Sequence, residues 1–311
     1  MNNNQGSYKA QFELDIPPSP SGLAKEHCRA NRKQIEKICR HRDEQVRIEF
    51  PTANGTTSAI YTVTTFHNDD ADIVFLGGKI QNQLQNCQLS NTEACEGEVK
   101  AQVTIEGLDD KEVEERGEFI EQLSHDDRNH RLVVIAPHGG EIEQWTDKQA
   151  EYVRNYYFPS ELVSLWICKG FSSKDEDDAF ERWHITSTEL SEKSFPKLKA
   201  IFGQKFEYSI AFHGWRHDSI CVGGSAGNDL IGLVKESIES ALKAQGSDIK
   251  VNDPNCPEGC PDGFNGDNDK NIVNRLGTKG IQIEQCKKAR ECYHEVIAKA
   301  VVDAISSRIN F

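Results

Sequence analysis

The chain has 311 residues, 37% of them apolar, and a formal net charge of −14. This length allows one large domain or two smaller ones, and no apolar run approaches the ~18–20 residues that a bilayer-spanning helix needs. Residues 91–127 hold 13 Asp/Glu against 3 Lys/Arg, which argues against nucleic-acid binding, whereas residues 270–311 hold 8 Lys/Arg against 4 Asp/Glu and suit an anionic substrate.

The first 22 residues are polar and contain PPSPSG, a composition that predicts a flexible arm over 1–22. Residues 23–43 are compatible with a helix. Between 46 and 106, short β-rich pieces (VRIEF, SAIYTVTTF, DIVFLGG, KAQVTIEG) alternate with Asn, Asp, Gly and Thr, which predicts a β-rich subdomain.

The acidic stretch 109–124 begins with two aspartates and carries Val113, Phe119, Ile120 and Leu123. This spacing predicts a helix with acidic residues at its start. We therefore expect residues 23–125 to form one unit, made of a helix, a β-rich subdomain and an acidic helix.

From residue 126 to 311 the pattern alternates between strands and helices. Strands are predicted at 131–136, 162–168, 207–213, 219–222, 248–251 and 280–284, and helices at 147–157, 194–202, 227–245 and 286–308, with loops at 170–181 and 253–270. Such alternation predicts an α/β fold with a mixed, mostly parallel sheet covered by helices.

The chain contains ten cysteines, several of them at close spacing: 28/39, 87/95, 256/260 and 286/292. An even number at such spacing predicts disulfides and an extracellular location. No leader segment is visible among the first residues, so a cytoplasmic location stays open. The spacing does not fix which cysteines pair.

Three predicted strands end in an ionisable side chain. LVVIAPH ends at His138, YSIAFHG at His213 and GIQIE at Glu284. Ligands of open α/β sheets bind outside the carboxyl ends of the strands, so these side chains converge if the strands are neighbours. Two histidines and a carboxylate leave an open position for water on zinc, as in hydrolytic sites. A tight turn beside a core is the alternative explanation for the His-Gly-Gly sequence.

Five stretches, APHGGEIE, WHITST, AFHGWRHD, CVGG and NIVNRLGTKGIQIE, occur in an order that resembles phage-type poly-γ-glutamate hydrolases. The resemblance covers roughly residues 131–308. It implies a carboxypeptidase-like α/β fold and one Zn²⁺ per chain. Where the family continues with Gly and Thr, this chain has Gln144-Trp145-Thr146, and Trp145 could narrow the cleft.

The resemblance also implies roles for particular residues. The metal ligands fall on His138, Glu143 and His213, with Glu141 open as an alternative carboxylate because carboxypeptidases use a His-x-x-Glu spacing. The catalytic acid falls on Glu284. Candidate substrate-binding residues in or beside the motifs are Arg275, Arg182, His184, Gly223, Gly224 and Arg290, with Arg275 the first choice for a substrate carboxylate.

We therefore expect the zinc-dependent hydrolysis of γ-glutamyl bonds in poly-γ-glutamate or related γ-glutamyl peptides. The substrate would be an anionic polymer or peptide, with no nucleic acid or membrane as a partner. Two alternatives stay open. One is a carboxypeptidase or deacylase acting on ordinary amides, and the other is a secreted binding module of the same fold without catalysis.

Overall fold

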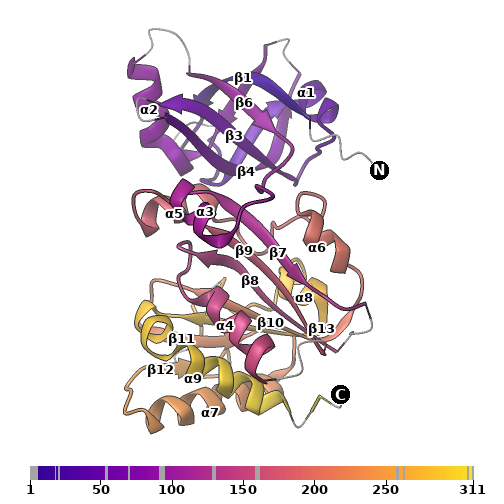
Figure 1. Cartoon of the computed structure of the whole chain (residues 1–311), viewed down its shortest axis with the longest axis vertical. Coiled ribbons are helices and arrows are strands. Elements are labelled where there is room, and N and C mark those ends of the chain that lie inside the picture. Colours follow the sequence, from indigo (N-terminus) through magenta and orange to yellow (C-terminus); the bar gives the residue numbers. More distant parts are fainter. Residues whose placement is uncertain are drawn as a thin grey trace.

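The computed structural model describes residues 6–17, 19, 22–52, 55–68, 71–90, 95–127, 131–157, 162–256, 259–261, 263–306 and 308–309. Two β structures follow one another along the chain, a closed six-stranded barrel and a seven-stranded sheet covered by helices (Figure 1). The predicted mixed sheet with helices is therefore present, and the β-rich N-terminal region is a barrel.

The barrel has the strand order β1-β5-β2-β4-β3-β6. Its elements are β1 (Ser7–Leu14), β2 (His27–Asn31), α1 (Arg32–Lys37), β3 (Gln45–Thr52), β4 (Gly55–His67), β5 (Ile73–Leu76), the 3₁₀ helix η1 (Gly78–Ile80), α2 (Gln81–Ser90) and β6 (Cys95–Lys100). Alternate side chains of the strands fill the interior with apolar groups such as Phe12, Val46 and Val99. A disulfide between Cys87 and Cys95 joins α2 to β6.

The prediction of a flexible arm over 1–22 is wrong for residues 7–14, which form β1. This strand pairs with β6 and β5, and the alternation that buries Ala10 and Phe12 supplies its apolar face. Residues 1–5, 18, 20 and 21 of the predicted arm lie outside the described residues. The single helix predicted over 23–43 is instead β2 followed by α1.

The prediction of one helix over 109–124 is also wrong for the second half of this range. A capping box of Asp109 and Glu112 begins α3 (Asp110–Arg116), and Gly117 ends it at φ 61°. Residues 119–124 then form β7 (Phe119–Ser124), an edge strand of the seven-stranded sheet. We therefore propose that the boundary between the two regions lies between β6 and α3 rather than at 125/126.

The seven-stranded sheet has the order β12-β11-β13-β10-β8-β9-β7. Its other strands are β8 (Leu132–Gly140), β9 (Val163–Gly170), β10 (Phe206–Gly214), β11 (Ser219–Gly223), β12 (Lys250–Asn252) and β13 (Gly277–Gln285). The four central strands β13, β10, β8 and β9 are mutually parallel, so their carboxyl ends share one edge. β7 and β11 run antiparallel to their central neighbours.

Helices cover both faces of this sheet (Figure 1). The core on one face includes side chains from α4 (Thr146–Tyr152), α7 (Asn228–Ala244) and α9 (Lys287–Ser306). The core on the other includes side chains from α5 (Glu176–Trp183), α6 (Pro196–Ile201) and α8 (Ile272–Leu276). The π helix η2 (Val153–Tyr157) continues α4. Within the loop predicted over 170–181, the structure instead begins α5, and α8 was not predicted.

Two further findings concern covalent and membrane features. A second disulfide joins Cys221 on β11 to Cys260, so Cys260 does not pair with its sequence neighbour Cys256. Among the helices that the structure describes, none is both long and apolar enough to cross a membrane.

Candidate active site

The strand ends singled out from the sequence meet at one edge of the sheet. β10 lies between β8 and β13, and His213 stands directly opposite Glu284 in the β10–β13 register. His138, at the end of β8, is buried with them: His138 and His213 are each 2% exposed and Glu284 is 6% exposed. Neighbouring parallel strands thus place all three side chains at one site.

Gly139 and Gly140 are required by the backbone beside His138. A Cβ at Gly139 would stand 2.8 Å from the Cys168 carbonyl oxygen, and Gly140, at φ 70°, would place one 2.7 Å from the Gly170 carbonyl oxygen. Both contacts are too short for a side chain, and the positive φ favours glycine. The His-Gly-Gly sequence therefore serves a tight packing of β8 on β9 as well as presenting the histidine.

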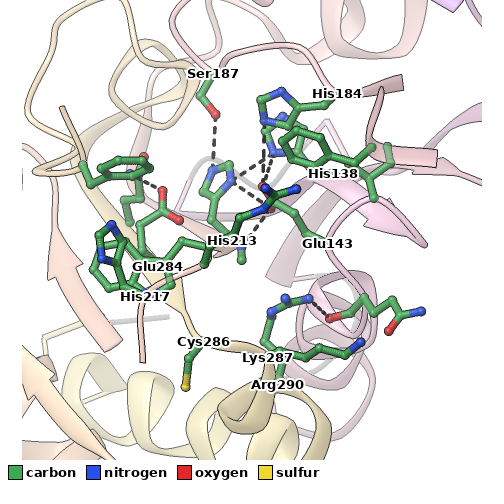
Figure 2. Close-up of a pocket in the computed structure, with 18 of the residues that line it drawn as sticks. His138, Glu143, His184, Ser187, His213, His217, Glu284, Cys286, Lys287 and Arg290 are labelled. Atoms are coloured by element: carbon green, nitrogen blue, oxygen red, sulfur yellow. Dashed lines mark hydrogen bonds and ion pairs between the residues drawn. The ribbon is translucent and has the colours of Figure 1, made fainter. Parts of the chain in front are cut away.

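The turn after β8 returns a carboxylate to the histidine. The backbone N–H of Glu143 donates to the His138 carbonyl at 2.8 Å, and its side chain lies beside the imidazole (Figure 2). Glu141 points elsewhere, because its Oε2 accepts the backbone N–H of Ser172 at 2.7 Å. Of the two carboxylates left open by the sequence, Glu143 is the one that lies with the histidines.

The donor atoms of this cluster are spaced as the ligands of one metal ion are. The Nδ1 atom of His138 lies 3.0 Å from Glu143 Oε1 and 3.2 Å from His213 Nδ1, and His213 Nδ1 lies 3.3 Å from Glu143 Oε2. Tetrahedral zinc, with bonds of about 2.0–2.2 Å, holds its ligand atoms about 3.3 Å apart. Two nitrogens and a carboxylate at this spacing fit zinc.

Hydrogen bonds on the far side of each group fix these orientations. Nε2 of His138 lies 2.8 Å from the Ile185 carbonyl oxygen. That oxygen can only accept, so the imidazole proton belongs on Nε2 and the Nδ1 lone pair faces the cluster. Ser187 Oγ lies 3.4 Å from His213 Nε2, and the backbone N–H of Gly214 donates to Glu143 Oε2 at 2.9 Å.

The carboxylates of the site have opposite electrostatic environments. Burial acts to raise the pKa of Glu143, but His138 and His213 outweigh it and hold that pKa well below its usual range. For Glu284, burial and then the charge of Glu143 raise the pKa well above the usual range, against the opposing effect of Arg290. The first carboxylate is therefore ionised, whereas the second has a raised affinity for a proton.

His184 forms a second possible triad with His138 and Glu143, whose donor atoms all lie within 4.8 Å of one another. Its Nε2 lies 3.9 Å from Glu143 Oε1, farther than the 3.3 Å between His213 and the same carboxylate. Its Nδ1 is bonded to Glu26. These distances favour His213 for the third ligand position, which stays a proposal, and His184 lines the pocket beside it.

The cluster opens into a cavity of about 1030 Å³. Its lining joins residues of the strand ends to four basic side chains, Arg216, Lys287, Lys288 and Arg290. Three of these are ion-paired with acidic residues of the same lining: Arg216 with Asp177, Lys287 with Glu176 and Lys288 with Asp248. Arg290 is 8% exposed, and its Nη1 donates to the Gln144 carbonyl at 2.6 Å. An aromatic group of Trp215, His217 and Phe264 forms another part of the wall.

Four of the predicted substrate-binding residues are not among the residues that line this cavity. Arg275 donates to the Leu190 carbonyl and to Glu192, both at 2.6 Å. Arg182 donates to the Ser58 carbonyl at 2.8 Å. Gly223 packs against Asn265, and Gly224 against Gly280. We correct these predictions: their polar or backbone groups serve internal packing, whereas His184 and Arg290 do line the cavity.

Other lining residues were not predicted. Lys287 and Lys288 follow the Glu284 strand directly, and the basic composition of that segment was their signal. The Ile185 carbonyl, which is not part of the lining but bonds to His138, could not be predicted, because main-chain atoms are the same in every residue type. Trp145, which the sequence placed near the cleft, takes a left-handed φ of 75°, is 39% exposed, stacks on His294 and is not among the cavity-lining residues.

Comparison with known proteins gives the relationship of the chain. It is 27% identical over 173 residues to the UPF0714 protein YmaC of Bacillus subtilis strain 168; the match covers 54% of this chain and only 62% of that relative. A solved bacteriophage poly-gamma-glutamate hydrolase is 22% identical, with a TM-score of 0.47 over 61% of this chain and 89% of the other. The structure described as YNDL, zinc-free apo form, is 18% identical, with a TM-score of 0.47 over 67% and 98%. The model of the poly-gamma-glutamate hydrolase family matches residues 105–302, more than half of the sequence, and the chain therefore belongs to this family.

Proposed function

We propose that this chain is a zinc-dependent hydrolase that cleaves γ-glutamyl amide bonds. The observation that carries the proposal is the spacing of His138 Nδ1, His213 Nδ1 and the Glu143 carboxylate, which suits one zinc ion. Glu284 lies on the strand next to His213 and within the region matched by the family model. Membership in the family supports the γ-glutamyl substrate.

The chemistry divides between the metal and the chain. His138, Glu143 and His213 would hold the zinc ion, which when bound would supply a water of lowered pKa and a Lewis acid for the substrate carbonyl group. Glu284 accepts the proton of the attacking water and passes it to the leaving nitrogen. Burial and the charge of Glu143 raise the pKa of Glu284, so this carboxylate takes up a proton more readily than an exposed one, which suits a base in this position.

The basic residues of the cavity lining support the proposal that the substrate is an anionic chain. Each unit of a γ-linked glutamate polymer carries a free α-carboxylate. Arg290, Lys287 and Lys288 line the cavity on α9. Lys287 is ion-paired with Glu176 and Lys288 with Asp248, whereas Arg290 is hydrogen-bonded to carbonyl oxygens. Arg290 is therefore the first candidate donor to these carboxylates. His184 borders the metal ligands from the opposite wall and contacts the bound unit.

The two disulfides support a location outside the cytosol, because disulfides persist in oxidising compartments. A secreted enzyme would meet an extracellular γ-glutamyl polymer directly. We therefore place the substrate and the enzyme in the same extracellular space.

The decisive experiment measures zinc content by elemental analysis and the cleavage of γ-linked against α-linked glutamate oligomers by mass spectrometry. We expect about one zinc per chain and shortening of the γ-linked oligomer alone. Cleavage of the α-linked oligomer instead would support a carboxypeptidase. If the protein contains zinc and binds an oligomer but cleaves neither, the result would support the non-catalytic binding module and contradict our proposal.

A further inference from the structure

The imidazoles of His138 and His213 both contact one short segment, residues 184–187, which lies outside β8 and β10. The Ile185 carbonyl lies 2.8 Å from His138 Nε2, and Ser187 Oγ lies 3.4 Å from His213 Nε2. Figure 2 shows Ser187 and His184 above the two ligand histidines. The segment therefore supplies the far-side partner of each imidazole.

The alternate residues of the same segment are bound by the N-terminal barrel. Glu26, in the turn before β2, accepts the Thr186 backbone N–H at 2.9 Å and the Thr186 hydroxyl at 3.1 Å through Oε2. Its other oxygen, Oε1, is bonded to His184 Nδ1. Ile185 and Ser187 thus contact the ligand histidines on their far side, while His184 and Thr186 are bonded to the barrel. His184 also borders His138 and Glu143.

Lys79 of η1 adds a second anchor from the barrel. Its ammonium donates to the Ile60 carbonyl at 2.8 Å and to the His184 carbonyl, and the residue is only 3% exposed. Burial lowers the pKa of Lys79 to about 8, against the opposing charge of Glu26. A lysine held this far from water is costly unless it is bonded, whereas the Glu26 side chain is 17% exposed. The position of Lys79 therefore calls for a reason beyond packing.

We propose that the barrel is a working part of the active site, with Glu26 and Lys79 as positioning residues that hold segment 184–187 against the ligand histidines. This inference rests on the proposed zinc site. By fixing the Ile185 carbonyl, the barrel keeps the His138 proton on Nε2 and its Nδ1 lone pair toward the metal. The matched family region begins at residue 105, so both anchors lie outside it.

The test compares full-length variants. Glu26→Ala removes all three bonds to the segment. Lys79→Met removes the bond to the His184 carbonyl together with the bond to the Ile60 carbonyl within the barrel. Glu26→Gln retains an acceptor oxygen for Thr186 and should recover part of the loss. Gln83→Ala is the matched control, because Gln83 is also a barrel residue that bonds across to the sheet region, at 2.9 Å from Asp178, without touching the segment.

Three quantities are measured: zinc affinity by chelator competition, kcat and KM on a γ-linked oligomer, and deuterium uptake of the peptide spanning 184–187. For Glu26→Ala we expect a 10- to 100-fold rise in the zinc dissociation constant, roughly the effect of losing an outer-shell partner. The loss should fall on kcat more than on KM, and deuterium uptake should rise. The Gln83→Ala control should stay within about twofold of wild type.

The outcomes separate this inference from the proposed function. If wild type binds zinc and cleaves the oligomer while Glu26→Ala and Lys79→Met lower only the melting temperature, the inference is overturned and the function stands. If wild type binds no zinc, the proposed function fails and the positioning role fails with it, whatever the deuterium uptake. A rise in the dissociation constant for Glu26→Ala that Glu26→Gln partly reverses supports the inference.

Discussion

Replacing Glu284 by Gln separates catalysis from binding at this site. The side chain is 6% exposed, and its Oε1 accepts Gln282 Nε2 at 2.9 Å. Gln has the same shape and retains an acceptor for that bond. Because burial disfavours the charged form of Glu284, a neutral isostere should fold at least as stably as wild type.

The expected loss in rate follows from the proposed role. General-base catalysis contributes about 10²–10⁴-fold, which corresponds to roughly 3–5 kcal/mol of barrier at 1.36 kcal/mol per decade. We expect kcat on a γ-linked glutamate oligomer to fall by this factor, with zinc content unchanged. A stopped assay of released amine by mass spectrometry measures it.

The control is Glu141→Gln, in the turn after β8, where an amide oxygen can still accept the Ser172 N–H. It should leave kcat within about threefold of wild type, because Glu141 has no part in proton transfer. Retention of more than a tenth of wild-type kcat by Glu284→Gln, with zinc bound, would refute the assignment of Glu284 as the base.

Three further predictions concern metal, stability and pH. His213→Ala should lose the bound zinc, measured by elemental analysis of the folded variant, because one of three donors is removed. Glu121→Ala should lower the free energy of unfolding by about 2–4 kcal/mol in urea titration. The Glu121 carboxylate is 3% exposed and accepts the indole N–H of Trp166 on β9 and the backbone N–H groups of Lys197 and Leu198 at the start of α6. An unchanged urea midpoint would contradict this prediction. The hydrogen bond to Glu189, 2.8 Å away, raises the pKa of His27 against the effect of burial. The stability that protonated His27 contributes is fully present below its unfolded pKa of about 6.5, and it is lost as the pH rises through the higher pKa of the folded state. The urea midpoint of wild type should therefore fall over this pH range, and Glu189→Gln should show a smaller fall.

The sequence by itself determined the parts of this protein that depend on local pattern. Aliphatic runs ending in His138, His213 and Glu284 identified three strand ends, and the alternation after residue 126 indicated the sheet on which they lie. Parallel strands share their carboxyl edge, so the convergence followed once these strands proved to be neighbours. The cysteine count predicted disulfides, and two are present.

The sequence pattern gave a wrong prediction where the same residues fitted both a helical and a strand periodicity. Phe119, Ile120 and Leu123 match a helical spacing, but Gly117 ends the helix in a left-handed conformation and the following residues join the sheet as β7. Residues 119–124 form a strand because they pair with the edge of β9. Local propensity carries no information about such a distant pairing partner.

Only the tertiary structure decided which polar groups face the cavity. Arg275 lies in a family motif, yet Glu192, distant in sequence, binds its guanidinium outside the cavity. The choice between Glu141 and Glu143 depended on the path of one turn. The bonds from Glu26 to segment 184–187 join residues about 160 positions apart, because charged groups find partners through space, and sequence distance carries no information about that.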